Sequence, residues 1–249
     1  MGIGLIVAAL SALGVIGWFL FAEAGKAPID STSLCPADGP TGHLAILLDT
    51  TDPVSSTQLR AARNRITDMI DGAPDFTRIS FATVSPDGDI RAGSFTSLCK
   101  PPSDASALIG NPRLVAERYE VSFVTPVRAA LDGLLAIPEA QASPILEALQ
   151  EFLTRIPDFG TGDAPREVVL VTDLVQHSDV FSFYRGDDWA SFRNSGAADR
   201  LARSLTDTRV RILRLPRPAA PQAVVDDFWR RYLDAQGASA VTTTTLGDL

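Results

Sequence analysis

The sequence predicts an α/β fold, a Rossmann-like three-layer sandwich with a mostly parallel central sheet. Two apolar runs, residues 44–48 and 167–172, lack the polar–apolar alternation of a strand with one solvated face, so both are expected to be covered on both sides. Predicted strands also alternate with predicted helices, the order that produces parallel strands joined by crossover helices. The chain has 249 residues, 45% hydrophobic and 21% charged, which is typical of a globular protein.

The individual elements follow from local signals. Ser55 and Ser56 are suited to cap a helix that runs to about residue 70 with apolar residues at helical spacing. Proline is favourable at the first helical position, so two further helices are expected to begin at Thr125 and at Ser143, each of which precedes a proline. The remaining expected elements are a hairpin of residues 77–84 and 90–97, strands 167–172 and 209–215, and helices 189–205 and 221–236.

The N-terminal segment predicts a single-pass membrane anchor over residues 1–24. Residues 3–22 carry no charged side chain, and ~20 such residues cross a hydrocarbon core of ~30 Å. Trp18 would suit the membrane interface. A cleavable signal peptide is the alternative, because small residues surround Glu23, but the apolar stretch exceeds the ~7–15 residues of a signal core.

The rest of the chain divides into a tether, one domain and a tail. Residues 25–41 are rich in Pro, Ser, Gly and Asp, which is the composition of a linker. Residues 42–240 form the predicted domain. Residues 241–249 are polar and are expected to be either a frayed tail or a short edge strand.

The chain has only two cysteines, Cys35 and Cys99. If the predicted hairpin rises and descends, both residues lie at the amino end of the first strand, so we expect them to form a disulfide. Two unrelated buried thiols are the alternative. A disulfide would place the domain outside the cytoplasm, in a periplasmic or extracellular position.

Charge and motifs exclude several functions. The net charge of −8 and pI of about 4.8 argue against nucleic-acid binding, which needs clustered basic side chains. The sequence contains no nucleophile elbow, Walker loop, His-Glu-x-x-His or Cys-x-x-Cys motif. The enzyme hypothesis that survives is a Mg²⁺-dependent phosphoesterase using an acidic cluster of Asp49, Asp52, Asp173 and Asp179.

Acidic and hydroxyl residues follow both buried strands. Asp49 and Thr51 come directly after the first run, and Asp173 ends the second. The carboxyl ends of parallel strands are where ligands bind in open α/β sheets. These oxygen donors therefore predict a site for a hard cation, although Asp49 and Thr51 would also serve as helix caps.

This pattern resembles the metal-ion-dependent adhesion site of von Willebrand factor A-like domains. That site has Asp-x-Ser-x-Ser after the first strand, a Thr from a middle loop, and an Asp after the fourth strand. Asp49, Thr51 and Asp173 look like the corresponding residues here. Pro53 stands in place of the second serine, and Ser55 lies close enough to replace it through a rearranged loop.

The resemblance covers roughly residues 43–235 and leaves two candidates for the middle-loop hydroxyl, Ser143 and Thr125. We favour Ser143, because its helix leads directly into the strand that ends at Asp173. The ligands implied by the resemblance are Asp49, Thr51, Ser143 and Asp173, and the implied cation is Mg²⁺ or Mn²⁺.

In that family the cation keeps an open position for a carboxylate of the partner protein. The resemblance therefore implies a membrane-anchored protein-binding or scaffold module whose partner belongs to a membrane-associated complex. A metal-free structural subunit of such a complex is the alternative. His177 is expected near the site, either as a supplementary ligand or as a surface donor. Four aromatic residues follow it and are expected to form either a contact surface or core: Phe181, Phe183, Tyr184 and Trp189.

Overall fold

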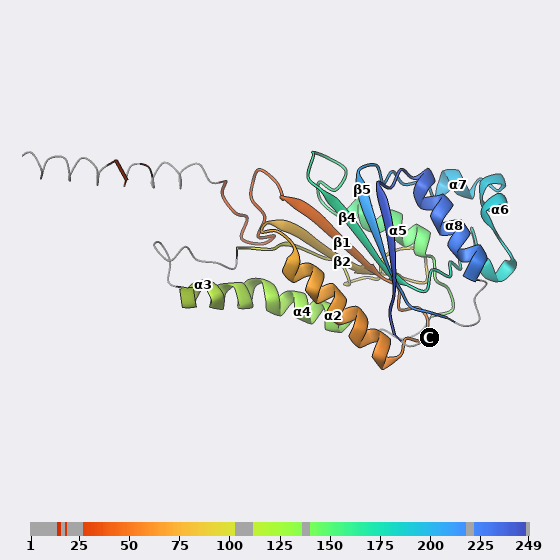
Figure 1. The fold of residues 1–249 in the computed structure, drawn as a ribbon, viewed down its shortest axis with the longest axis horizontal. Helices are drawn as coiled ribbons and strands as arrows, with labels where there is room; N and C mark the ends of the chain where they lie inside the picture. Colours follow the sequence, from red (N-terminus) through yellow and green to blue (C-terminus); the bar gives the residue numbers. More distant parts are fainter. Residues whose placement is uncertain are drawn as a thin grey trace, which may run out of the picture.

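The computed structural model describes residues 14, 15, 18, 27–102, 112–135, 140–217 and 222–247. Within them, a six-stranded sheet has the order β3-β2-β1-β4-β5-β6 (Figure 1). Every neighbouring pair is parallel except β2 and β3, which are antiparallel. The strands are β1 (Gly42–Leu48), β2 (Thr77–Thr83), β3 (Thr96–Cys99), β4 (Arg166–Thr172), β5 (Thr208–Arg214) and β6 (Ala240–Thr245). The prediction of a mostly parallel α/β sheet is confirmed.

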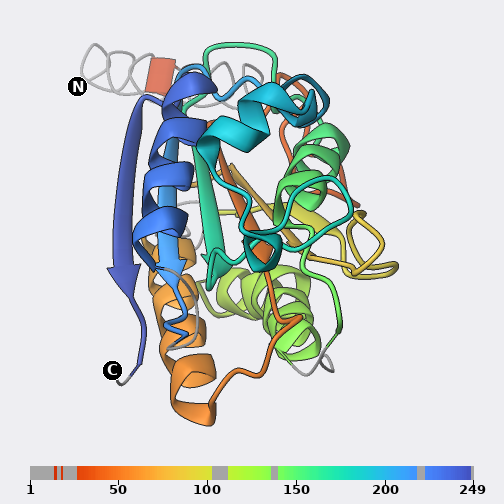
Figure 2. The same ribbon diagram turned by 90° about the vertical axis from the view of Figure 1, so that its right-hand side faces the viewer.

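Helices cover both faces of the sheet, which completes three layers (Figures 1 and 2). One face carries α2 (Ser56–Gly72) and a continuous helical segment made of α3 (Pro112–Tyr119), the π-helical turn η1 (Glu120–Val124) and α4 (Thr125–Leu135). The other face carries α5 (Ile145–Arg155), α6 (Trp189–Asn194), α7 (Ala197–Arg200) and α8 (Gln222–Ala235), with the short 3₁₀ turn η2 (Phe183–Arg185).

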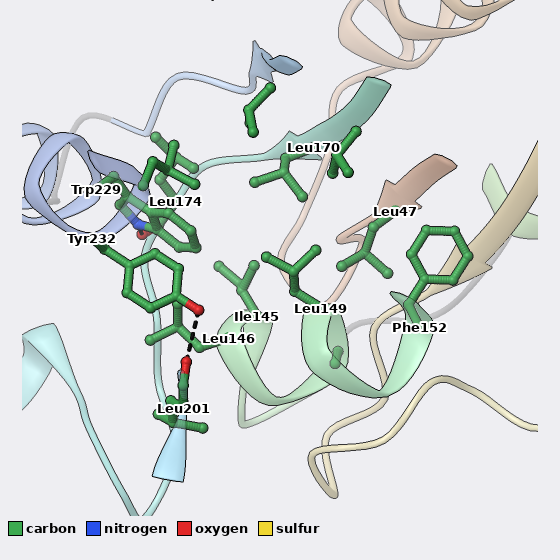
Figure 3. Packing of buried hydrophobic residues seen from close by; sticks show 14 of the residues in the cluster. Leu47, Ile145, Leu146, Leu149, Phe152, Leu170, Leu174, Leu201, Trp229 and Tyr232 are labelled. Carbon is green, nitrogen blue, oxygen red and sulfur yellow. Dashed lines mark hydrogen bonds between the residues drawn. The ribbon is translucent and has the colours of Figure 1, made fainter. Parts of the chain in front are cut away.

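The central strand β1 shows why its sequence lacks alternation. Leu44, Ile46 and Leu48 pack in the core on the α2 side, while Ala45 and Leu47 pack in the core on the α5 side. Figure 3 shows Leu47 facing Leu149 and Phe152 of α5, while Tyr232 of α8 lies at the other end of α5 near Leu146. The Tyr232 hydroxyl donates a hydrogen bond of 2.8 Å to the Leu201 carbonyl, which satisfies a polar group in an otherwise apolar layer.

Helix α4 begins at Thr125 as expected, but the loop-to-helix step predicted there is wrong, because η1 leads into α4 without a break. Thr125 lies inside a continuous helical segment, and its N–H donates to the carbonyl of Glu120, five residues earlier. Pro126 has no N–H, and its ring would clash with the preceding turn of a regular helix. The wider π-helical turn that precedes it accommodates the proline without ending the helix.

The predicted helix 189–205 is also wrong in its extent. Two short helices, α6 and α7, occupy its first part and are separated at Gly196, whose φ of 74° is left-handed. Glycine adopts this conformation without the steric cost that a side chain would add. The β3 strand begins at Thr96, later than expected, because residues 91–95 form turns between the two arms of the hairpin.

The segments on either side of the predicted domain contribute to it. Residues 240–245 form β6, which pairs in parallel with β5, so the edge-strand alternative for the tail is confirmed. In the predicted tether, Ile29 bridges to Pro36, and the Asp30 carboxylate accepts hydrogen bonds from Thr32 and Ser33. Residues 29–36 of the tether therefore form a local hydrogen-bonded turn.

The predicted disulfide between Cys35 and Cys99 is confirmed. Their Cα atoms are 4.9 Å apart and both side chains are buried. Cys99 pairs in register with Arg78 at the amino end of β2, and its N–H donates to the Ser33 carbonyl. The bridge therefore ties the segment before β1 to the end of the hairpin.

The predicted anchor, residues 1–24, lies outside the described residues except for positions 14, 15 and 18. Within the part of the chain that the structure describes, no helix has the length and hydropathy needed to cross a membrane.

Candidate functional site

The candidate site lies at the carboxyl edge of the sheet, between β1 and β4. These two strands are neighbours, and the strand order reverses between them: β2 and β3 lie to one side, β5 and β6 to the other. Crevices at such a switch point are where open α/β sheets bind ligands. Asp49 follows β1, Asp173 follows β4, and both side chains are about 95% buried (6% and 5% exposed).

Asp49 is the centre of a buried hydrogen-bond network. Its Oδ1 accepts from the Thr51 hydroxyl at 2.6 Å and from the Thr51 N–H at 3.2 Å. Its Oδ2 accepts from the Ser143 hydroxyl at 3.0 Å and from the Thr172 hydroxyl at 2.9 Å. The structure thus brings together three of the predicted residues and adds Thr172, which sequence reasoning missed. The signal for Thr172 was a hydroxyl at the last position of a buried strand, directly before the second aspartate.

Ser143 is held beside Asp49 by the loop that follows β4. Its N–H and carbonyl form a reciprocal pair with the backbone of His177, at 2.9 and 2.8 Å. The fully buried Gln176 strengthens this contact, because its Oε1 accepts from the Leu146 N–H at the start of α5. Gln176 was not predicted, since its role depends on a helix 30 residues earlier in the chain.

Asp173 is fixed by an unusual backbone turn. Its Oδ1 accepts from the Val175 N–H at 2.7 Å. Leu174 adopts a left-handed φ of 69°, which costs a side-chain-bearing residue roughly 1–2 kcal/mol. The Leu174 N–H donates to the Thr172 hydroxyl at 2.8 Å, and its carbonyl accepts from the Trp229 indole at 2.8 Å. These tertiary bonds hold the turn in a conformation that the sequence does not favour.

Arg217, in the connection after β5, completes the site. Its Nε lies 2.7 Å from Oδ2 of Asp173, an ion pair without the alignment of a hydrogen bond. Its Nη2 lies 3.1 Å from Oδ1 of Asp52. The guanidinium therefore joins two carboxylates that the sequence assigned to a cation or catalytic cluster. Sequence reasoning missed Arg217 because no local pattern links it to residues near Asp52.

The electrostatics of the site show an excess of negative charge. The pKa of Asp173 is raised to about 7, first by burial and then by repulsion from Asp49, while the Val175 N–H and Arg217 act in the opposite direction. The pKa of the Tyr184 hydroxyl is also raised, first by burial and then by Asp52. A cation at this edge would relieve both effects.

The donor set fits a small hard cation. Asp49, Thr51, Ser143 and Asp173 offer only oxygen atoms, which Mg²⁺ prefers. A hollow of about 20 Å³ lies among Asp49, Asp52, Pro53, Val54, Gln58, Asp173, Leu215, Pro216 and Arg217, enough for roughly one water or ion. No group of three or more His, Cys, Asp or Glu side chains among the described residues is arranged to hold a metal, so the hydroxyls would have to act as ligands.

Two of the supplementary candidates have other roles. Ser55 is exposed, and its hydroxyl accepts from the Gln58 N–H at 3.1 Å in a capping box at the start of α2. Thr125 is exposed on α4 and takes no part in the hydrogen bonds of Asp49. The structure therefore places Ser143, and not Thr125, beside Asp49.

His177 lies next to the site and borders a second hollow. Its Nδ1 is 2.7 Å from the Ser182 hydroxyl, and its ring meets Tyr184 edge to face at 5.2 Å. A hollow of about 200 Å³ is lined by Thr51, Asp52, Ala140, Gln141, Ala142, Ser143, His177 and Tyr184. Of the four predicted aromatics, Phe181 and Phe183 are core residues and Trp189 packs against the core, whereas Tyr184 is 57% exposed.

No family model matches this chain, and no curated protein matches it. Among solved structures, the chain is similar to a von Willebrand factor type A from Catenulispora acidiphila, with 16% sequence identity and a TM-score of 0.44. The similarity covers 84% of this chain and 39% of that chain, so this chain spans well under half of that structure.

Proposed function

We propose that this domain is a protein-interaction module of the von Willebrand factor A-like type, which binds its partner at the carboxyl edge of the sheet. The observation that carries the proposal is the convergence of Asp49, Thr51 and Ser143 at the switch point, beside a hollow of about 200 Å³. Tyr184 borders that hollow and is 57% exposed. Exposed tyrosines are common anchors of protein interfaces, because one ring supplies both apolar area and a hydrogen-bonding group.

The cation in this proposal is Mg²⁺ or Mn²⁺, held by Asp49, Thr51, Ser143 and Asp173. The bound cation would neutralise the buried carboxylates and keep a position open for a carboxylate of the partner. We expect weak affinity, because Pro53 supplies no hydroxyl and Ser55 is used as a helix cap. Millimolar concentrations would then be needed to fill the site.

The proposed location is the extracytoplasmic side of a membrane, with residues 3–22 as the anchor. The disulfide between Cys35 and Cys99 supports an oxidising compartment, because such bonds are rare where thiols are kept reduced. The proposed partner is a protein of a membrane-associated complex.

The test is capture of a partner from membranes by the full-length protein. We expect capture to require Mg²⁺, to be lost in chelator, and to fall at least tenfold in Tyr184→Ala. Val121→Ala is the matched control, because Val121 is 66% exposed on η1, which packs against the opposite face of the sheet.

Other results would redirect the proposal. Equal capture by Tyr184→Ala and the wild type would remove the carboxyl edge as the binding surface. Capture that is insensitive to chelator would favour a metal-free structural subunit. Turnover of a generic phosphoester that Asp49→Ala abolishes would favour the phosphoesterase.

A further inference from the structure

We infer that Arg217 is a built-in cation of the carboxyl edge: its guanidinium occupies the space between Asp173 and Asp52, and a divalent cation must displace it to bind. This inference rests on the proposed cation site and deepens it. Arg217 would then compete with the cation for the carboxylates, in addition to stabilising the fold.

The first support is geometric. Arg217 Nε is 2.7 Å from Asp173, and Arg217 Nη2 is 3.1 Å from Asp52, so one side chain contacts both carboxylates. These residues and Asp49 line the same hollow of about 20 Å³. A space of that size holds roughly one water or ion, so the guanidinium and a hydrated divalent cation do not fit beside each other.

The second support is the distribution of hydrogen-bond donors. Asp49 is satisfied by Thr51, Ser143 and Thr172. By contrast, Oδ2 of the buried Asp173 has no hydrogen-bond partner among the described residues and lies 2.7 Å from Arg217 Nε. An arginine side chain stays protonated at any pH a protein tolerates. It therefore supplies a permanent positive charge to a buried carboxylate oxygen that the described residues leave without a hydrogen bond.

The third support is the way in which the chain holds Arg217. The Leu215 N–H donates to the Thr172 carbonyl at 2.9 Å, which fixes the start of the connection against β4. The Arg217 carbonyl accepts from the Gln222 side chain at 2.9 Å, at the start of α8. Displacement of the guanidinium would therefore strain a segment that is hydrogen-bonded to β4 and α8. Cation binding would then be coupled to the conformation of this connection.

The experiment is a titration of the full-length protein in detergent with MnCl₂, followed by calorimetry and by the electron paramagnetic resonance of free Mn²⁺. We expect Arg217→Gln to bind Mn²⁺ at least tenfold more tightly than the wild type, because the competing charge is gone. Arg217→Lys keeps the charge and should stay weak. Arg211→Gln is the matched control, since Arg211 lies on strand β5 but pairs with Glu167 of β4 instead of with the site carboxylates.

A measurement of thermal stability separates a loss of folding from a change in Mn²⁺ affinity. Without cation, Arg217→Gln leaves Asp173 and Asp52 without their guanidinium, so its Tm should fall below that of the wild type and rise again with MnCl₂. Circular dichroism checks that the variant is folded, and Arg217→Met, which matches the length of the stem, is the second variant if Arg217→Gln does not fold.

The outcomes separate the two proposals. Equal Mn²⁺ affinity in Arg217→Gln and the wild type would overturn the competition by Arg217 and leave the cation site standing. No binding at millimolar MnCl₂ in the wild type and in both charge-removing variants would overturn the cation site itself, and this inference with it.

Discussion

The two ends of the sheet differ in chemistry, although both are built from the same strands. The carboxyl edge is acidic and tightly hydrogen-bonded, with Asp49 and Asp173 buried and hollows of about 20 and 200 Å³. The amino edge is crosslinked by the disulfide and has a larger cavity of about 520 Å³, whose lining includes Arg65, Arg166, Arg209 and Arg211. Cavity size and functional chemistry thus point to opposite ends.

We place the proposed site at the carboxyl edge because two buried carboxylates, Asp49 and Asp173, lie there, and Asp49 accepts hydrogen bonds from the hydroxyls of two loops. Leu174 is held there at positive φ, and Oδ2 of the buried Asp173 has no hydrogen-bond partner within the described part of the chain. The charges in the large amino-edge cavity are partly matched: Arg211 pairs with Glu167 at 2.7 Å, and Arg166 lies 3.9 Å from Asp207. Among the described residues, positive φ and unpaired buried polar atoms occur at both ends of the sheet, as at Phe76 and His43 on the amino edge, so the convergence of carboxylates and hydroxyls marks the proposed site better than strain or cavity volume does.

The amino edge has features that stabilise the fold instead. Lys100 is buried, and its Nζ donates to the carbonyls of Asp71 and Ala73 at the end of α2. His43 is buried at the start of β1, with its ring edge to face with Phe159 at 5.4 Å. Burial, and then the nearby Arg78, lower the pKa of His43 to about 4. This end therefore depends on a crosslink, a capping lysine and a neutral histidine.

The largest expected effect comes from the disulfide at the amino edge. It closes a loop with a sequence separation of 64, so its loss in Cys35→Ser/Cys99→Ser should lower the free energy of unfolding by about 4 kcal/mol. Unfolding of the wild type and the double variant in guanidinium chloride measures the difference in free energy. The double variant should be insensitive to reductant, whereas the wild type should be destabilised by it. If the double variant loses less than ~1 kcal/mol of unfolding free energy, the disulfide is not a main stabilising feature of the amino edge.

The next effect is the acid sensitivity that His43 confers. Its folded pKa of about 4 lies below the unfolded value of ~6.5, so the unfolded state binds more protons as the pH falls. The stabilising contribution of His43 is fully present above pH ~6.5 and is lost progressively toward pH 4. At pH 5 the loss of stability amounts to roughly 2 kcal/mol. In His43→Phe this part of the acid sensitivity should disappear.

The measurement for His43 is the free energy of unfolding of both proteins at pH 7.5 and at pH 5. Phenylalanine keeps a ring against Phe159, and the comparison of the two pH values within each protein cancels any packing change. If His43→Phe and the wild type lose equal stability on acidification, the neutral histidine is not a stabilising feature of the amino edge.

The smallest effect tests whether Ser55 is a cap or a cation ligand at the carboxyl edge. Ser55→Ala removes the hydroxyl that accepts from the Gln58 N–H, which should cost about 1 kcal/mol of stability. Ser56→Ala is the matched control, because Ser56 is the first residue of α2 and lies outside the capping box. Mn²⁺ affinity should be the same in both variants. A lower Mn²⁺ affinity in Ser55→Ala, with no change in Ser56→Ala, would show that Ser55 is a cation ligand.

Much of the fold could be predicted because its signals are local. The apolar runs of β1 and β4 show burial on both faces without reference to distant residues, and the aspartate that ends each run is fixed by chain order. The capping box of α2 depends on residues three positions apart. The disulfide was predictable from the hairpin, because only two cysteines exist.

Other features failed at the sequence level because two local solutions were equally good. Thr125 and Ser143 each precede a proline, and both matched a loop-to-helix step. The α3–η1–α4 segment absorbs Pro126 through a π-helical turn, a choice that depends on the packing of Phe123 and Val127 in the core. No local sequence signal near Thr125 indicates this π-helical turn.

By itself the sequence determined the α/β class, the two acidic strand ends and the crosslink, because periodicity, capping and chain order act over a few residues. Only the tertiary structure decided which hydroxyl reaches Asp49, since Ser143 contacts it across a separation of 94 residues. It also decided that Arg217 pairs with Asp52 and Asp173. These contacts depend on distances between segments that are remote in the chain, and such distances exist only after the sheet has assembled.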